Sequence, residues 1–279
     1  STVGKAAGSM LLSTNITGAL TNVASTEIQP GLTDVRRNQP KLYDFIRKAF
    51  TASSHITYVE KKNPDGAAAM TAEGTVKPLV DFDMASATSR AKKVAARARV
   101  SMEMLNDIAF MSAEIDKELR FSVYKTLSAQ IRSGNNTGEQ LQGLTTIGSA
   151  FAVATIKTTA PTNIDAILAV VAAGKILNFN YDVILVNPID YANMKLAKDT
   201  TGQYIMQNGM LDGTIQIVED NDQTVGSFIA FDSTVVNFYI YEDLVVKMGL
   251  DGTDFSENMF TIIAEMRVHM FVKSNEVNG

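Results

Sequence analysis

Residues 101–132 carry the feature that most constrains the fold, an amphipathic pattern that continues for about thirty residues. Apolar or small side chains recur there at steps of three and four, at Met102, Leu105, Ile108, Ala109, Ser112, Ile115, Leu119, Val123, Leu127 and Ile131. This spacing predicts one α-helix with a single buried face. Ser101 is placed to cap its start, and Gly134 follows its end. At 1.5 Å per residue the helix is roughly 45 Å long, so we expect a flat, elongated body.

The segments before this helix predict a long two-stranded excursion. Ile56–Glu60 alternates as a strand does, residues 61–69 have the composition of a loop tip, and Thr88–Val100 alternates basic with small apolar residues as a return limb. A hairpin of this kind is marginal alone in water, so it needs a surface to lie on. Lys41–Phe50 has helical spacing. Residues 1–35, rich in small and polar residues, predict an extended arm that finds partners on other subunits, or else a disordered tail.

Beyond residue 133 the pattern changes to alternating helices and strands. Thr162–Asn178 predicts a helix that begins with a capping box of Thr162 and Asp165. Val183–Val186 is a short apolar strand, and a helix follows it. Further strands are expected at residues 214–219, 226–231, 235–242, 244–248 and 259–272. No repeat or long linker divides the chain, so these elements predict an α+β fold of intertwined modules.

Composition excludes several classes of protein. The 279 residues contain no cysteine, so disulfides and thiolate metal sites cannot form. The two histidines, His55 and His269, lie outside any nucleophile-elbow context, which disfavours a soluble hydrolase. A net charge of −5 argues against a general nucleic-acid binder. The longest apolar run, Ile164–Ala173, is far shorter than the roughly 20 residues of a membrane span, and no signal peptide is visible.

Two loops resemble ligand-binding motifs only superficially. Residues 134–138, Gly-Asn-Asn-Thr-Gly, are not followed by Gly-Lys-Ser/Thr and come after a helix, so they predict a structural loop with positive φ angles instead of a phosphate site. Residues 220–222, Asp-Asn-Asp, lack the glycine and the glutamate of a calcium loop. We therefore expect no cofactor and no metal site.

Three stretches in fixed order carry a family resemblance. They are Ala72-Glu73-Gly74-Thr75-Val76-Lys77-Pro78, the glycine-rich loop at 134–144, and the apolar strand 256–268, which contains Glu265 and Arg267. In this order they resemble the major capsid proteins of tailed bacteriophages, the Hong Kong 97 type of shell subunit. The resemblance covers nearly the whole chain.

The resemblance implies a subunit with an N-terminal arm, an extended hairpin called the E-loop, a peripheral domain built on a spine helix, and an axial domain. The arm and its first helix would occupy 1–50 and the E-loop 51–100. The peripheral domain would comprise 101–160 and 244–279, and the axial domain 161–243.

In the crosslinking member that gives the fold its name, an E-loop lysine attacks an asparagine of a neighbouring subunit, assisted by a glutamate. By position, Lys77 matches the lysine, Asn258 the asparagine and Glu265 the glutamate. A desolvated carboxylate of raised pKa could serve as the acid and base. Many relatives do not crosslink, and there the same residues would be interface charges. Arg267 and the basic residues Arg97 and Arg99 are expected at interfaces.

The function implied is a mature major capsid protein, assembled in the host cytoplasm and located in the virion as an icosahedral shell around double-stranded DNA. Its partners would be other copies in hexamers and pentamers, a portal, a maturation protease, a decoration protein and the packaged DNA, which it would contact without sequence specificity; no membrane is expected. A scaffolding segment would have preceded Ser1. The alternative is an encapsulin-type compartment shell, which shares the fold and encloses enzymes. A soluble enzyme is the third class.

Overall fold

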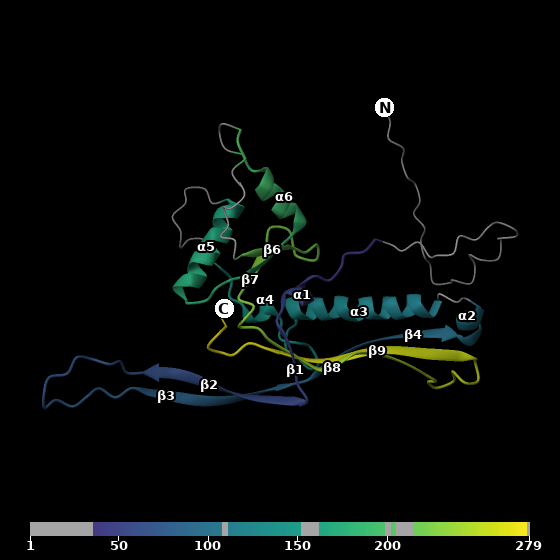
Figure 1. The fold of residues 1–279 in the computed structure, drawn as a ribbon, viewed down its shortest axis with the longest axis horizontal. Helices are drawn as coiled ribbons and strands as arrows, with labels where there is room; N and C mark the ends of the chain where they lie inside the picture. Colours follow the sequence, from purple (N-terminus) through teal and green to yellow (C-terminus); the bar gives the residue numbers. More distant parts are fainter. Residues whose placement is uncertain (1–35, 108–110, 152–161, 199–201, 205–214, 278–279) are drawn as a thin grey trace. The chain divides into compact units, whose positions relative to one another are not determined.

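The computed structural model describes residues 36–107, 111–151, 162–198, 202–204 and 215–277. The expected N-terminal arm at 1–35 lies outside these residues. Within the described part, two sheets and a separate two-stranded hairpin are present, together with helices that cover the sheets (Figure 1).

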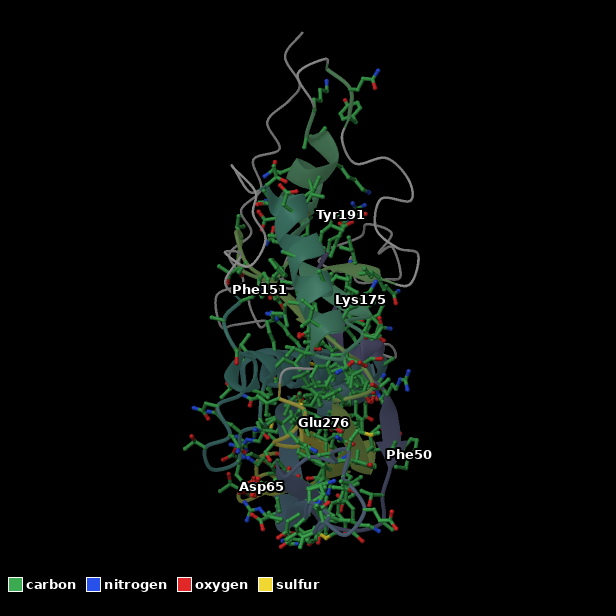
Figure 2. The ribbon with its side chains drawn as sticks, turned by 90° about the vertical axis from the view of Figure 1, so that its left-hand side faces the viewer. Phe50, Asp65, Phe151, Lys175, Tyr191 and Glu276 are labelled. Carbon is green, nitrogen blue, oxygen red and sulfur yellow. The ribbon has the colours of Figure 1, made fainter. Side chains whose placement is uncertain are left out.

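The larger sheet has four strands in the order β1-β8-β9-β4. Its strands are β1 (Lys48–Phe50), β4 (Lys92–Ser101), β8 (Asn237–Gly249) and β9 (Met259–Phe271). Both β4 and β8 pair antiparallel with β9, whereas β1 pairs parallel with β8. Strand β9 is therefore an inner strand of the sheet, paired on both sides. At the sheet edge, the side chain of Phe50 projects outward and is 75% exposed (Figure 2).

The predicted long helix is present as α2 (Met102–Asp107) and α3 (Met111–Ser133), while residues 108–110 lie outside the described part. The hydroxyl of Ser101 accepts a hydrogen bond from the backbone N–H of Met104 at 3.2 Å, as an N-cap does. Helix α3 lies along the sheet, over β4 and β9 (Figure 1). The predicted apolar face is confirmed in the second half of the helix, where Leu119, Val123, Leu127 and Ile131 are buried, together with Ser128, which was not predicted.

Gly134 directly follows the last residue of α3, at a position where no larger residue fits. Its N–H donates to the carbonyl of Gln130 at 2.8 Å, and a Cβ on it would lie 2.3 Å from the carbonyl oxygen of Leu141. Such a distance is impossible for real atoms without movement of the backbone. The positive φ angles expected in this loop occur at Asn136 and Gly138.

We expect Gly134→Ala to lower the free energy of unfolding by about 1–3 kcal/mol, because the added methyl group forces the loop backbone away from the helix end. Gly249→Ala is the matched control, since a Cβ there meets no atom within 4 Å. Urea unfolding of the two variants measures the difference. Equal midpoints for both would show that the close approach is not a constraint.

The hairpin consists of β2 (His55–Asp65) and β3 (Asp81–Arg90), which pair antiparallel with each other and with no other described strand. Figure 1 shows it continuing beyond the larger sheet, on the side away from the start of β9. The first four residues of β3 are all exposed and alternate residues are exposed after them, while the residues that follow β2 are exposed throughout. The excursion expected from the sequence is therefore present.

The smaller sheet has the strand order β6-β5-β7. Its elements are β5 (Val183–Val186), β6 (Gln216–Glu219) and β7 (Phe228–Phe231), with helices α5 (Asn163–Ile176) and α6 (Pro188–Leu196). Val183 and Leu185 join the core beneath α3, whereas Ile184 and Val186 pack with α5 and α6. Both faces of β5 are thus buried, which explains its unbroken apolar sequence. The capping box predicted at Thr162 is confirmed.

Four element predictions are wrong in extent. The loop tip expected at residues 61–69 starts later, because β2 continues to Asp65. The helix expected over Lys41–Phe50 is only α1 (Leu42–Phe45), because Ile46 is extended and the next residues pair with β8. The return limb expected at Thr88–Val100 is divided, since β3 ends at Arg90 and β4 pairs with β9. The strands expected at 235–242 and 244–248 are one strand, β8, with two register shifts.

The remaining described helix is α4 (Leu144–Ile147), one turn that follows the glycine-rich loop. None of the helices in the described residues has the length and apolarity needed to cross a membrane.

Candidate functional site

Glu265 lies in the middle of β9, on the face of the sheet opposite α3. Its two carboxylate oxygens accept hydrogen bonds from Lys247 of β8 at 2.8 Å and from Lys93 of β4 at 3.2 Å. These two ammonium groups hold the pKa of the carboxyl below its usual range. The raised pKa expected from the sequence is therefore wrong for the single chain, in which Glu265 is a paired carboxylate.

Arg267 lies two residues further along the same face. It donates to Glu242 of β8 at 2.9 Å, and its guanidinium lies 4.7 Å from the centre of the Tyr241 ring. Together with Glu242 it borders a cleft of about 590 Å³, whose other walls include His55 and Arg90, the first and last residues of the hairpin. Arg267 is thus fixed by its own chain and still reaches a concave surface.

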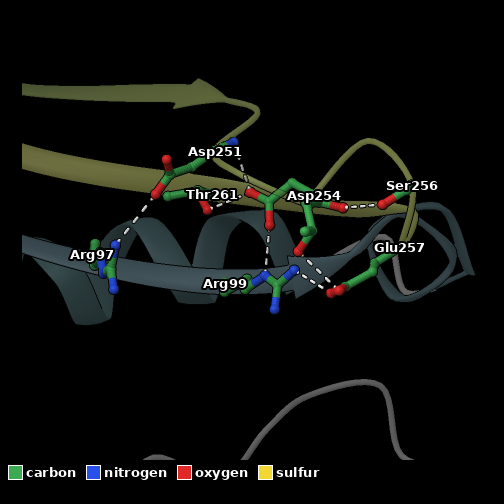
Figure 3. A network of polar contacts seen from close by, with 8 residues as sticks. Arg97, Arg99, Asp251, Asp254, Ser256, Glu257 and Thr261 are labelled. Atoms are coloured by element: carbon green, nitrogen blue, oxygen red, sulfur yellow. Dashed lines mark hydrogen bonds and ion pairs between the residues drawn. The ribbon is translucent and has the colours of Figure 1, made fainter.

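Arg97 and Arg99 point from β4 toward the turn that joins β8 to β9 (Figure 3). Arg99 donates to Asp254 at 2.6 Å and to Glu257 at 2.5 Å, and Arg97 donates to Asp251 at 3.4 Å. The two arginines therefore hold the turn against the edge strand of the sheet.

Asp254 is the centre of this turn and is 2% exposed. It accepts hydrogen bonds from the hydroxyl of Thr261 at 2.6 Å and from the backbone N–H of Asp251 at 2.9 Å, in addition to that from Arg99. The bond from Thr261, followed by those from Asp251 and Arg99, lowers the pKa of Asp254. A buried carboxylate with this many donors fixes the geometry of the whole turn.

Asn258 is the last residue of the turn, immediately before β9. Its φ is +53°, its side chain is exposed, and its carbonyl accepts the backbone N–H of Met102 at 2.9 Å. Because it lies outside the strand, strand alternation does not fix its direction relative to Glu265. Seven residues of extended chain nevertheless put the two about 23 Å apart. One chain does not bring this asparagine and this glutamate together.

Lys77 lies in the exposed segment between β2 and β3. The register of β4 with β9 places Asn258 beside the end of β4 at Ser101, whereas the hairpin joins the beginning of β4 at Lys92. The ten residues of β4 span about 33 Å. Figure 1 shows the hairpin extending further in the other direction. Lys77 of one chain therefore does not reach Asn258 of the same chain.

The hairpin carries an unusual concentration of exposed apolar side chains. Their exposed fractions are 103% for Met70, 94% for Val76, 81% for Leu79, 70% for Met84, 62% for Val59, 55% for Val80 and 43% for Phe82. A second group lies around the β8–β9 turn and includes Phe255 at 81% and Leu250 at 52%. Large exposed apolar side chains gathered on one hairpin indicate a binding surface.

Comparison with known proteins decides the family. A protein-family model described as "Phage capsid family" matches residues 21–276. The chain belongs to the phage capsid family. The major capsid protein of Enterobacteria phage HK97 is 25% identical over 249 residues, which cover 86% of this chain and 63% of that protein. The chain thus spans less than two thirds of the length of this relative.

Solved structures share the fold of this capsid-family chain. A chain from Mycobacterium phage Cain has a TM-score of 0.71 at 14% identity, and 93% of each chain is covered. The capsid of a native GTA particle has a TM-score of 0.70 at 14% identity, with 96% of this chain and 97% of that chain covered. The predicted resemblance is confirmed, and the mixed helix and strand architecture is the Hong Kong 97-like capsid fold.

Sequence reasoning missed two ion pairs of this phage capsid-family chain in which the carboxylate is buried. The sequence does not show that Asp254 meets Arg99, because the pairing depends on the turn that brings residue 254 back over β4. Asp220, rejected as a calcium ligand, is 2% exposed at its side chain and accepts a hydrogen bond from Arg132 at 2.8 Å. A weak signal existed in Arg132, a charged residue next to the apolar face of the long helix. No group of His, Asp and Glu in the described residues has the arrangement of a metal site.

Proposed function

We propose that this chain is a major capsid protein that assembles with other copies of itself into an icosahedral head shell around double-stranded DNA. The observation that carries the proposal is the exposed apolar hairpin on a chain of the phage capsid family. The family match and the capsid structures that share the fold support it. We place the protein in the virion.

The energetic argument rests on the hairpin tip. Met70, Val76 and Leu79 are each more than four fifths exposed in the single chain. Burial of apolar surface contributes about 25 cal/mol per Å², so covering several such side chains supplies several kcal/mol at each contact. In a closed shell every copy would make these contacts with its neighbours, and many weak contacts would act together.

Each structural part receives a role in this proposal. The β2–β3 hairpin is assigned to the E-loop expected at 51–100, although β4, which ends that range, pairs within the four-stranded sheet. That sheet with α3 is assigned to the peripheral domain, and the expected boundary at 243 falls inside β8. The β6-β5-β7 sheet with α5 and α6 is assigned to the axial domain. Hexamers and pentamers would form around the axial domain. A portal, a maturation protease, a decoration protein and non-specific contact with packaged DNA complete the expected set of partners.

Shell formation is tested by electron microscopy of the purified full chain, together with the nucleic-acid content of particles recovered from infected cells. The proposal predicts closed shells and nuclease-protected double-stranded DNA. Shells that enclose proteins and no DNA would identify a compartment shell instead, and a monomer under all assembly conditions would contradict the proposal.

We further propose that Lys77 of one copy crosslinks to Asn258 of a second copy. The uncharged amine nitrogen of Lys77 attacks the side-chain amide carbon of Asn258, the new N–C bond replaces the bond to Nδ2, and ammonia leaves. Glu265 would take the proton from the attacking amine and pass it to the leaving nitrogen. Because about 23 Å separates Asn258 from Glu265 within a chain, the glutamate would come from a different copy than the asparagine.

For this transfer Glu265 must be freed from Lys93 and Lys247, whose hydrogen bonds lower its pKa. Boiling assembled particles in SDS measures the crosslink. A ladder of covalent multimers is expected from the wild type, and Lys77→Arg, which keeps the charge and removes the nucleophilic amine, should leave one band at 30.2 kDa. A single band from fully assembled wild-type shells would contradict the crosslink and leave the proposed shell untouched.

A further inference from the structure

The base of the β2–β3 hairpin contacts the end of β9 and the residues that follow β9 at three successive places. In chain order, His269 meets Ser53 and Ser89, Phe271 meets Tyr58, and Ser274 meets Glu60. The anchored positions on the hairpin and on the C-terminal segment thus follow one another in the same order. Both histidines of the chain lie in this region, because His55 begins β2.

Glu60 forms the outermost of these contacts and is 4% exposed. One carboxylate oxygen accepts the backbone N–H of Ser274 at 2.8 Å, and the other accepts the Ser274 hydroxyl. Lys62 lies 3.9 Å from the same carboxylate. The carboxylate is therefore satisfied as an acceptor by a segment far away in sequence. A protonated carboxyl would lose its charge and one of these acceptor positions.

His269 forms the innermost contact and is fully buried. Its Nε2 lies 3.2 Å from the carbonyl oxygen of Ser53, and its Nδ1 lies 3.5 Å from the hydroxyl of Ser89. A carbonyl can only accept, so in the neutral ring Nε2 donates to Ser53 and Nδ1 is the acceptor for Ser89. A second proton on Nδ1 would remove that acceptor and place a charge in a buried site.

The aromatic contact lies between these two groups. The rings of Tyr58 and Phe271 stack with centroids 4.3 Å apart at an angle of 7°. Tyr239 of β8 lies on the other side, 6.0 Å from Phe271. This stack carries no group that titrates in the acid range, so acid acts on the contacts at either side of it.

We propose that the base of the hairpin is an acid-sensitive joint, in which the Glu60–Ser274 and His269–Ser53 contacts hold the hairpin at neutral pH and proton uptake by Glu60 and His269 releases it. The inference concerns the single chain and does not depend on shell formation.

The direction of the pH effect follows from the two groups. Burial lowers the pKa of His269, and the bonds from Ser274 lower the pKa of Glu60. A group with a lowered pKa stabilises the folded arrangement above its ordinary pKa and loses this contribution as the pH falls. The contribution of His269 therefore declines below about pH 6.5, and that of Glu60 declines below about pH 4.3. Both changes loosen the joint in acid.

The charges next to His269 and Glu60 do not reverse the direction of this pH effect. His55 and Arg267 face His269, and both disfavour a second positive charge. Lys62 and Lys273 face Glu60 and favour its ionised form. The other charged groups around the base are in ion pairs or border the cleft, namely Arg90 with Glu139, Glu242 with Arg267, and Lys93 with Glu265.

The joint is tested by the distance between two nitroxide labels on the unassembled full chain. Ser86→Cys on the hairpin and Ala95→Cys on β4 give exposed attachment points, and the chain has no cysteine of its own. We expect one narrow distance distribution at about pH 7.5 and a shifted, broader one at about pH 3. A reference pair within the sheet, Ala95→Cys with Met248→Cys, should keep its distance.

Variants assign the effect to the two groups. His269→Gln should remove the change that begins near pH 6.5, and Glu60→Gln should remove the change at lower pH. Glu73→Gln, which changes an exposed glutamate in the segment between β2 and β3, should respond as the wild type does. A wild-type distance that is constant down to about pH 3 would overturn the proposal whether or not the variants fold. A simultaneous change in the reference pair would also overturn it, because that result reports general unfolding.

Discussion

Replacing residues 61–84 by a two-residue Asn-Gly turn is expected to abolish shell assembly while the rest of the chain stays folded. Glu60 and Ala85 are cross-strand partners, so a two-residue turn can join them without strain. The shortened hairpin keeps its contact with Ser274 and loses the exposed apolar side chains from Met70 to Met84. Without them, neighbouring copies lose the exposed apolar side chains that the proposal places at the contact.

The measurement is sedimentation combined with electron microscopy under conditions in which the wild type assembles. A matched control replaces Ala67, Ala68 and Ala69 by serine, which alters the same exposed loop and keeps its large apolar side chains. We expect shells from the control and soluble subunits with an unchanged circular dichroism spectrum from the shortened chain. Normal shells from the shortened chain would show that the hairpin does not carry assembly.

The second large effect is expected from Leu127→Ala in the middle of α3. Leu127 is fully buried in the main core, between the helix and the four-stranded sheet. Removal of three buried carbon atoms leaves a cavity and should lower the free energy of unfolding by about 2–5 kcal/mol. Unassembled subunits at equal concentration are required for the measurement, because assembly stabilises the folded state by mass action.

Leu196→Ala is the control for this change. Leu196 ends α6 and is 62% exposed, so its truncation should alter the free energy of unfolding by less than about 0.5 kcal/mol. Urea unfolding of both variants gives the two midpoints. If the two leucines proved equivalent, α3 would not be the helix on which the core is built.

The elements that the sequence predicted well are those fixed by local chemistry. The period of apolar residues from Met102 to Ile131 located the long helix, because a one-sided apolar pattern has few other solutions. The capping box at Thr162 and Asp165 located the start of α5 for the same reason, since both hydrogen bonds join residues three apart.

The elements that the sequence did not predict depend on pairing between distant segments. Leu42, Phe45, Ile46 and Phe50 have helical spacing, yet residues 48–50 extend as β1 because β8 offers them a free edge. Likewise β4 continues directly from the hairpin, and only its register with β9 shows that it belongs to the main sheet. Single-sequence periodicity carries no information about which strand is the partner.

The sequence identified the residues of the candidate site and did not predict which side chains surround them. Lys77, Asn258 and Glu265 were selected through the family resemblance, and whether they react remains a prediction. The lysines that pair with Glu265 come from β4 and β8, so their approach depends on two strand registers. Proximity of Asn258 to Lys77 would need a second copy, which no pattern within one chain describes.

The central claim is that the apolar hairpin of one copy is covered by another copy in a closed shell. A cryo-electron microscopy reconstruction of assembled particles at side-chain resolution tests it most directly. We expect closed shells in which Met70, Val76 and Leu79 lie against a neighbouring chain. Particles in which these side chains face solvent, or fold back onto their own chain, would contradict the claim.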